Sequence, residues 1–242
     1  MDYEKDFEEG YVHTSSGRIY FRRHRAGGRK FIFVHAMGST TKEWARLMGY
    51  LPDDCDVSLI DLLGHGRSDA PENFDYTISS QVQALQEFVA DQNNGSSFIV
   101  GHSYGGWIAA YYVSYNYPAK GLVLEASAGL EHESEFRKDR WQDEADDGML
   151  KRLLMLDNKE YVMRSIISNS SKEELTEDAL ASIRKPTLII WGEQDNILDP
   201  KFAQVFNEHI SGSRVEIMQG AGHSPQYTHP EEFAALLLDF AR

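Results

Sequence analysis

The sequence predicts an α/β fold: a mostly parallel central sheet with helices on both faces. Short apolar segments alternate with segments of helical spacing along most of the chain. The apolar segments are continuous, which is typical of strands that are buried on both faces. The 242 residues are 41% hydrophobic and 26% charged, so they can form one large globular domain rather than a disordered or low-complexity chain.

The first half of the chain establishes this alternation. Strands are expected at 18–25, 30–35, 57–62, 97–100 and 122–126, and helices at 41–51, 78–92 and 104–116. The helix over 78–92 rests on the spacing of Val82, Leu85 and Val89, which places them on one face. The helix over 104–116 is expected to end before Pro118, because proline cannot continue a helix.

The alternation stops after residue 126 and resumes near residue 184. Residues 131–147 are charged and polar, and helix-like segments follow at 149–156 and 159–167. The second half then gives strands at 187–191 and 214–218 and helices at 201–210 and 230–242. We therefore expect an α/β core of residues 1–126 and 184–242, interrupted by a helical cap insertion of residues 127–183. Such an insertion would lie over the carboxyl edge of the sheet, where open α/β sheets bind ligands, with Phe136, Trp141, Met149 and Met155 lining a substrate pocket.

Charge and composition exclude several classes of partner. The net charge of −14 repels phosphate backbones and anionic lipids, so neither nucleic acid nor a membrane surface is expected as a partner. No apolar stretch approaches the roughly 20 residues that a membrane span needs, and the acidic segment 1–10 does not resemble a signal peptide. The single cysteine, Cys55, excludes an intrachain disulfide, which fits a cytoplasmic location. The basic cluster Arg22, Arg23 and Arg25 is expected on the solvated face of a strand.

Motifs for metals and organic cofactors are missing from the sequence. Gly64-x-Gly66 lacks the third glycine and the downstream acid of a dinucleotide site, and there is no P-loop. No paired Cys/His spacing and no H-E-x-x-H motif suggest a metal site. We therefore expect the protein to work without a cofactor or a metal.

A candidate nucleophile lies in the segment Gly101-His102-Ser103-Tyr104-Gly105, which fits the pattern G-x-S-x-G. The segment falls between an expected buried strand and an expected helix, which is the context that a nucleophile elbow requires. A sharp turn there would expose Ser103 above the sheet and place the amide of Tyr104 where it can bind an oxyanion at the positive end of a helix. The alternative is a glycine-serine turn that leads into a helix without a catalytic role.

A serine hydroxyl needs a base, and the base needs a carboxylate that fixes its tautomer. His223 follows the last expected strand on a glycine-rich loop, and Asp195 follows the strand over 187–191. The chain order Ser103, Asp195, His223 is the order found in α/β-hydrolases. Glu125, Glu193 and Asp199 are rival acids, and His102 is expected to be a packing residue because side chains of consecutive residues at a tight turn diverge.

Several segments resemble the α/β-hydrolase superfamily, and the resemblance covers nearly the whole chain. They are Val34-His35-Ala36-Met37-Gly38, Asp61-Leu62-Leu63-Gly64-His65-Gly66-Arg67-Ser68, the elbow, Trp191-Gly192-Glu193-Gln194-Asp195 and Gly222-His223. Within the superfamily, the sequence is similar to the compact capped group of esterases, lactonases and haloperoxidase-like enzymes. The resemblance implies an α/β-hydrolase fold and a second oxyanion donor, the backbone amide of Met37. Ala36 departs from the family pattern, which usually has glycine at that position.

These observations predict a serine hydrolase that cleaves small carboxylic esters or lactones. Ser103 would form an acyl-enzyme, His223 would transfer the proton, and Asp195 would orient His223. Two alternatives stay open, because a fold does not determine a reaction. One is non-hydrolytic chemistry on the same residues, as in a lyase, a perhydrolase or a cofactor-free oxygenase. The other is a ligand receptor that retains the triad and turns over slowly.

Overall fold

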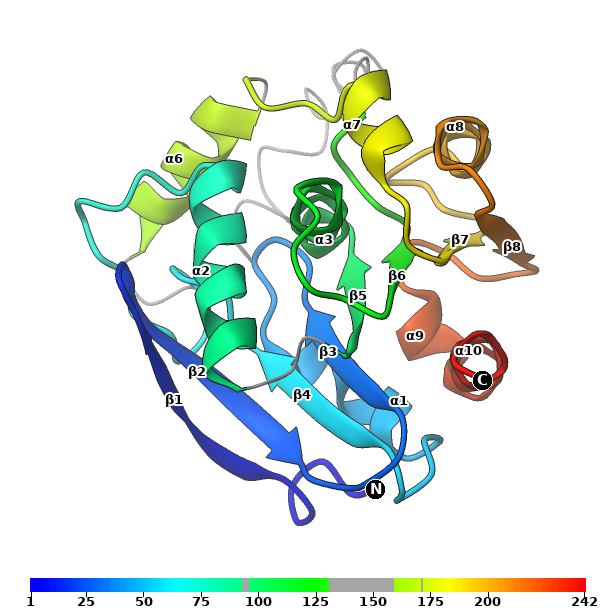
Figure 1. Ribbon diagram of the computed structural model, residues 1–242, viewed down its shortest axis with the longest axis horizontal. Coiled ribbons are helices and arrows are strands. Elements are labelled where there is room, and N and C mark those ends of the chain that lie inside the picture. Colours follow the sequence, from blue (N-terminus) through cyan, green and yellow to red (C-terminus); the bar gives the residue numbers. More distant parts are fainter. Residues whose placement is uncertain (93–95, 131–158, 171) are drawn as a thin grey trace.

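A computed structural model describes residues 1–92, 96–130, 159–170 and 172–242. Within these residues, an eight-stranded sheet forms the centre of the molecule, with the strand order β1-β2-β4-β3-β5-β6-β7-β8 (Figure 1). The strands are β1 (Glu8–Thr14), β2 (Gly17–His24), β3 (Lys30–Val34), β4 (Asp56–Ile60), β5 (Phe98–His102), β6 (Gly121–Glu125), β7 (Thr187–Gly192) and β8 (Arg214–Met218). β2 pairs antiparallel with β1 and β4, and the strands from β4 to β8 in this order pair in parallel.

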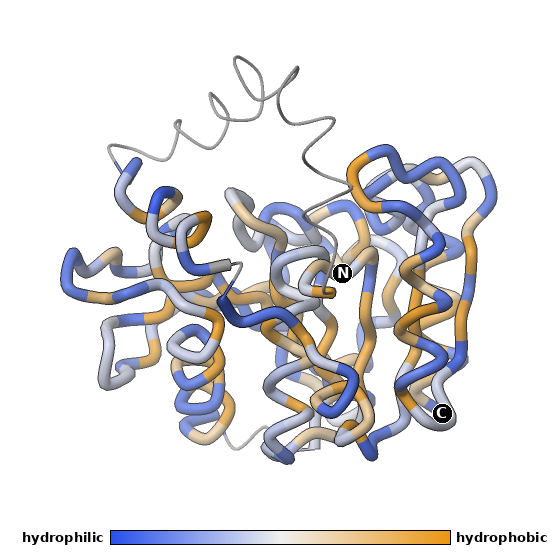
Figure 2. The backbone as a smooth tube through the Cα atoms, turned by 90° about the horizontal axis from the view of Figure 1, so that it is seen from above, coloured by the Kyte–Doolittle hydropathy of each residue, from blue (hydrophilic) through white to orange (hydrophobic). Residues whose placement is uncertain are grey.

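Helices cover both faces of the sheet, as the sequence predicts. One face carries α2 (Ile78–Asp91), α3 (Tyr104–Ser114) and α8 (Lys201–His209), and the other carries α1 (Ala45–Met48) and α10 (Pro230–Phe240). Each face has its own apolar cluster, because successive side chains of a strand point in opposite directions. In β3, for example, Ile32 and Val34 belong to one cluster, and Phe31 and Phe33 belong to the other. Figure 2 shows hydrophobic segments in the centre of the molecule. In the peripheral helices, hydrophobic and hydrophilic residues alternate along the chain.

The predicted α/β fold is confirmed, and the differences concern short or weakly apolar elements. The helix expected over 41–51 is a 3-10 turn, η1 (Thr41–Trp44), followed by the single turn α1. β1 was not predicted, because it is an edge strand in which only Val12 is buried, so it has no continuous apolar signal. A further short helix, α9 (Pro225–Thr228), precedes α10.

The basic cluster on β2 is only partly solvated. Arg22 and Arg23 are only 8% and 4% exposed, because other side chains pack on them. The guanidinium group of Arg22, for example, lies 4.1 Å from the centroid of the Tyr3 ring. Arg23 pairs with Asp56, with 3.3 Å between Nη2 and Oδ1. Arg25 is exposed, as expected, and pairs with Glu8. The prediction of a solvated strand face is therefore wrong for Arg22 and Arg23.

The described part of the expected insertion packs against α2 and α3. α6 (Glu160–Ser170) lies beside the start of α2, and Asn169 donates a hydrogen bond to the carbonyl of Asp75. α7 (Glu177–Ser182) packs on α3. The expected pocket residues Phe136, Trp141, Met149 and Met155 lie outside the described residues. Their place over the site, like the division into core and cap, stays a prediction.

Candidate active site

The carboxyl ends of three parallel strands carry the residues that the sequence predicts for catalysis. Ser103 follows β5 directly, Asp195 lies shortly after β7, and His223 lies between β8 and α9. Because these strands run in the same direction, their ends meet at one edge of the sheet (Figure 1). Segments far apart in the sequence therefore come together at this edge.

Ser103 occupies a strained turn between β5 and α3. Its φ is 52° and its ψ is −114°, a conformation that costs on the order of 1–3 kcal/mol for a residue with a side chain. The surrounding backbone holds this conformation. The amide of Ser103 donates to the carbonyl of Glu125 (2.9 Å), and the carbonyl of Ser103 accepts from the amides of Trp107 (3.1 Å) and Ala128 (3.0 Å). This is the geometry of a nucleophile elbow.

The glycines of the elbow are required because other backbone segments approach them closely. A Cβ on Gly101 would lie 2.3 Å from the carbonyl oxygen of Gly105, and a Cβ on Gly105 would lie 2.3 Å from that of Val34. Backbone atoms on both sides leave no flexible side chain that could give way. The G-x-S-x-G pattern is therefore a packing requirement of the turn between β5 and α3.

This packing gives a stability prediction for Gly105→Ala. The added methyl group must displace the backbone of β3 or α3, so we expect a loss of about 3 kcal/mol or more in the free energy of unfolding. Urea unfolding followed by circular dichroism measures it. Gly27→Ala is the control, because a Cβ there meets nothing within 4 Å, so its urea midpoint should stay close to that of the parent protein. Equal midpoints for both variants would show that the elbow tolerates a side chain at Gly105.

The structure brings His223 and Asp195 into direct contact. Nδ1 of His223 lies 2.7 Å from Oδ2 of Asp195, whose side chain is fully buried. The other carboxylate oxygen of Asp195 accepts from the amides of Ile197 (2.8 Å) and Leu198 (3.0 Å), so the carboxylate is fixed in place. Since Nδ1 donates to Asp195, Nε2 of the neutral ring is free of a proton, as a general base requires. Burial lowers the pKa of His223, although the hydrogen bond to Asp195 opposes this shift.

The rival acids have other partners. The carboxylate of Glu193 accepts from the amide of Gly220 (3.1 Å), and Asp199 forms an ion pair with Lys201 (3.2 Å). Glu125 is fully buried, and its Oε1 accepts from the amide of Gln226 (2.9 Å). Of the carboxylates considered, Asp195 is the one hydrogen-bonded to the His223 ring.

Two backbone amides are available for an oxyanion. The amide of Tyr104 begins α3, and that of Met37 lies on the loop between β3 and η1. Neither amide has a hydrogen-bond partner among the described residues. Gly38 takes the left-handed conformation on this loop (φ 73°), whereas Ala36 does not have a positive φ, so the loop accommodates alanine where the family usually has glycine.

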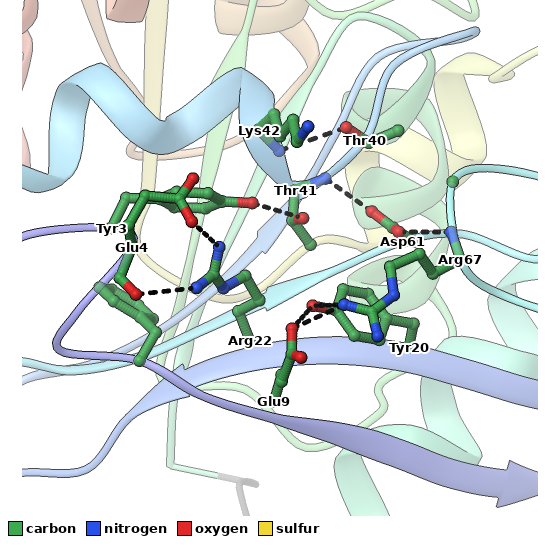
Figure 3. A pocket seen from close by; sticks show the side chains of 12 residues that line it. Tyr3, Glu4, Glu9, Tyr20, Arg22, Thr40, Thr41, Lys42, Asp61 and Arg67 are labelled. Carbon is green, nitrogen blue, oxygen red and sulfur yellow. Dashed lines mark hydrogen bonds and ion pairs between the residues drawn. The ribbon is translucent and has the colours of Figure 1, made fainter.

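A polar cavity of about 750 Å³ lies beside the loop that follows β3 (Figure 3). Asp61 holds together two loops at this cavity, because its carboxylate accepts hydrogen bonds from the backbone amides of Thr41 (2.6 Å) and Arg67 (2.8 Å). The cavity is lined by Tyr3, Glu4, Phe7, Glu9, Tyr20, Arg22, Thr40, Thr41, Lys42, Asp61, Gly66 and Arg67. Its two arginines are already paired with Glu4 and Glu9. None of the predicted catalytic residues lines it, so we assign it no part in the reaction.

His102 is buried, in agreement with the prediction of a packing residue. The sequence did not predict that both of its ring nitrogens form hydrogen bonds. Nδ1 lies 2.9 Å from Oε1 of Glu43, and Nε2 lies 2.8 Å from the carbonyl oxygen of His223. One feature of the sequence could have indicated these hydrogen bonds: an ionisable residue stands beside the proposed nucleophile, at the end of a buried strand.

Two further properties concern membranes and metals. In the parts of the chain that the structure describes, no helix combines the length and the apolar character needed to cross a bilayer. In the same parts, no group of three or more His, Cys, Asp and Glu side chains could hold a metal ion.

Comparisons with known proteins identify relatives of this chain. Monoacylglycerol lipase ABHD6 of Rattus norvegicus is 26% identical, over 95% of this chain and 81% of its own length. Pimeloyl-acyl-carrier-protein methyl ester esterase of Neisseria meningitidis is 28% identical, over 88% of this chain and 93% of its own length. Both relatives are named for hydrolysis of carboxylic esters, the reaction that the sequence predicts here.

Solved structures share the fold. A thermophilic esterase from Thermogutta terrifontis superposes with a TM-score of 0.80 at 18% identity, over 96% of this chain and 97% of its own. A serine hydrolase of carbazole degradation superposes with a TM-score of 0.79 at 24% identity, over 97% of this chain and 98% of its own. The model of the Alpha/beta hydrolase family matches residues 31–236. The chain therefore belongs to the alpha/beta hydrolase family, which confirms the resemblance seen in its sequence.

Proposed function

We propose that the protein is a serine hydrolase that cleaves small carboxylic esters or lactones through an acyl-enzyme. The observation that carries this proposal is the hydrogen bond between His223 and the buried carboxylate of Asp195, at the sheet edge that also holds the strained Ser103. A nucleophile on an elbow, a base with a free Nε2 and a fixed carboxylate are the parts that acyl transfer requires.

Each group has one role in the mechanism. Oγ of Ser103 attacks the ester carbonyl while Nε2 of His223 takes its proton, and Asp195 stabilises the imidazolium that forms. The amides of Tyr104 and Met37 bind the oxyanion of the tetrahedral intermediate. His223 then gives its proton to the leaving alcohol. Water, activated by the same ring, releases the acid from Ser103.

The substrate class follows from charge and from the relatives. A net charge of −14 disfavours strongly anionic substrates, so neutral or weakly polar esters fit the protein best. The names of two relatives, the monoacylglycerol lipase and the methyl ester esterase, both refer to ester substrates, which supports this class. We propose that the insertion of residues 127–183 covers the acyl side of the site and sets the chain length that the enzyme accepts.

Mixing the protein with p-nitrophenyl acetate tests this proposal. We expect a burst of nitrophenolate close to one equivalent per protein, followed by slower turnover, because acylation of Ser103 by this activated ester should be faster than hydrolysis of the acetyl-enzyme. Mass spectrometry of the quenched protein should find one acetyl group on the peptide that contains Ser103. Ser103→Ala should lose the burst and the adduct, and the matched control Ser213→Ala should retain both. Turnover without acetyl-Ser103 would contradict a nucleophilic serine and indicate that His223 acts directly as a base on water. Tight ligand binding with negligible turnover would favour a receptor.

A further inference from the structure

The proposed mechanism leaves unused a buried cluster of polar and ionisable side chains behind His223. Glu43 comes from η1, His102 from the end of β5, Glu125 from the end of β6, and Gln226 from α9. His102 is 2% exposed, Glu125 and Gln226 are 0% exposed, and the side chain of Glu43 is 10% exposed. Buried ionisable groups are costly unless they are paired, so their arrangement calls for a physical account.

The hydrogen bonds of His102 determine its protonation. Nδ1 faces a carboxylate oxygen of Glu43 and Nε2 faces the carbonyl oxygen of His223, and both partners act as acceptors. Both ring nitrogens must then donate, which makes His102 an imidazolium. His35 provides a contrast within the same molecule. One of its nitrogens faces the carbonyl of Ala36 and the other accepts from the amide of Leu62, which is the pattern of a neutral ring.

The amide of Gln226 is consistent with this assignment. When its oxygen faces His102, it accepts from Nδ1 at 3.3 Å, and its nitrogen donates to Glu125 and to the carbonyl of Ser224. The opposite orientation would direct an N–H at Nδ1, which already donates to Glu43. The orientation of an amide is assigned from its hydrogen-bond network, and here the network selects an acceptor for His102.

The cluster connects three catalytic segments through their backbones. The carboxylate of Glu43 accepts from the amide of Ala36 (3.2 Å), next to the oxyanion donor Met37. His102 precedes Ser103 and donates to the carbonyl of His223. One buried ion pair therefore contacts the oxyanion loop, the elbow and the loop that carries the base.

The charges also act on the base. The rings of His102 and His223 lie with their centroids 4.9 Å apart, so a positive charge on His102 opposes a second one on His223. Burial by itself disfavours a charged His102, but the negative charge of Glu43 and the hydrogen bond to it raise the pKa of His102 to about 9. His102, in turn, lowers the pKa of Glu43 against the effect of burial.

We propose that His102, ion-paired with Glu43, is a permanently protonated positioning residue that holds the His223 loop by its carbonyl oxygen and keeps the His223 ring neutral in mild acid. This inference rests on the proposed function, in which His223 is the base. The groups that act on His223 oppose one another. Burial and His102 favour its neutral form, whereas Asp195 and Glu43 favour its protonated form. Removal of the His102 charge should therefore shift the balance toward a protonated base.

The pH dependence of kcat/KM tests this change in the base. In the parent protein, kcat/KM for a neutral ester should rise through a pKa below the ordinary histidine value of about 6.5, because the pKa of His223 is lowered. His102→Gln removes the cation and leaves Glu43, so this acid limb should move to higher pH. If the limb moves by about one pH unit, kcat/KM in mild acid falls on the order of tenfold relative to its alkaline plateau. Glu43→Gln/His102→Gln removes both opposing charges, so its limb should lie between the other two.

A purely structural role would give a different result. If the cluster only packs, His102→Gln lowers kcat at every pH and the acid limb stays where it is in the parent protein. An unchanged limb in a folded His102→Gln protein overturns the proposal. Circular dichroism shows whether the variant folds. If it does not fold, Glu43→Gln is used as the test variant. In Glu43→Gln, His102 lacks its counter-ion, so it should lose its second ring proton at a lower pH than in the parent protein.

NMR titration separates this inference from the proposed function. In the inactive Ser103→Ala protein, the ring nitrogens of His102 should both be protonated at neutral pH, and ¹⁵N shifts report this without any turnover. A neutral His102 under these conditions overturns the proposal, whatever the activity of the parent protein. If no acyl-enzyme forms but His102 is protonated, the proposed function is rejected, whereas the inference that His102 carries a positive charge is retained.

Discussion

Replacement of Ser103 by alanine should lower kcat for an ester on the order of 10⁴-fold. The hydroxyl is the proposed nucleophile, and nothing else on the elbow can form the acyl-enzyme. His223→Ala should cost about as much, and the double variant should be little worse than either single variant, because the two residues act as a unit. Steady-state rates with p-nitrophenyl acetate, measured above the uncatalysed background, give these ratios.

The outcome for Ser103→Ala can also contradict the mechanism. If this variant retains most of the activity while His223→Ala is inactive, the serine positions the substrate and the histidine acts directly as a base. Additive losses in the double variant would show that the two residues work in separate steps. Thermal unfolding should show that both single variants are folded.

Asp195→Asn should also lower kcat on the order of 10⁴-fold, because an amide can donate to Nδ1 of His223 and so stabilise the wrong tautomer. The amide oxygen of asparagine can still accept from the amides of Ile197 and Leu198, so the loop should keep its shape. The matched control is Glu125→Gln, an isosteric change at a buried carboxyl group that does not contact the His223 ring. Its Oε1 can still accept from the amide of Gln226, so the loss of kcat should be far smaller.

The two acid variants decide between the candidate carboxylates. A nearly unchanged Asp195→Asn together with an inactive Glu125→Gln would move the catalytic acid to the end of β6. The same rate measurements serve both variants. Because the pKa of Glu125 is raised by burial to about 8, glutamine closely replaces its neutral form at neutral pH.

The elements that the sequence predicted well are those with a strong local signal. The strand expected at 30–35 is Lys30–Val34, and the helix expected at 78–92 is Ile78–Asp91. In both, the apolar pattern matches the period of the element, so tertiary packing follows it. β1 lacked such a pattern because its partner strand, rather than a buried face, holds it in the sheet.

The proposed site was predictable where chain order and context carry the information. Ser103, Asp195 and His223 each follow a strand whose apolar run is visible in the sequence. Glu43 and His102 were not predictable as a pair, because they are 59 residues apart and no spacing rule joins them. Their contact depends on where the turn η1 meets the end of β5, which only the folded backbone shows.

The position of β7 and β8 at one end of the sheet has a consequence for synthesis of the protein. The elbow is formed by β5, α3 and β6, which leave the ribosome well before the segments that carry Asp195 and His223. At about 5–20 residues per second, the ribosome needs roughly ten seconds to proceed from Ser103 to His223. Throughout that interval the nascent chain displays a serine without its base. It should therefore react with ester-like probes only after its last two strands have joined the sheet.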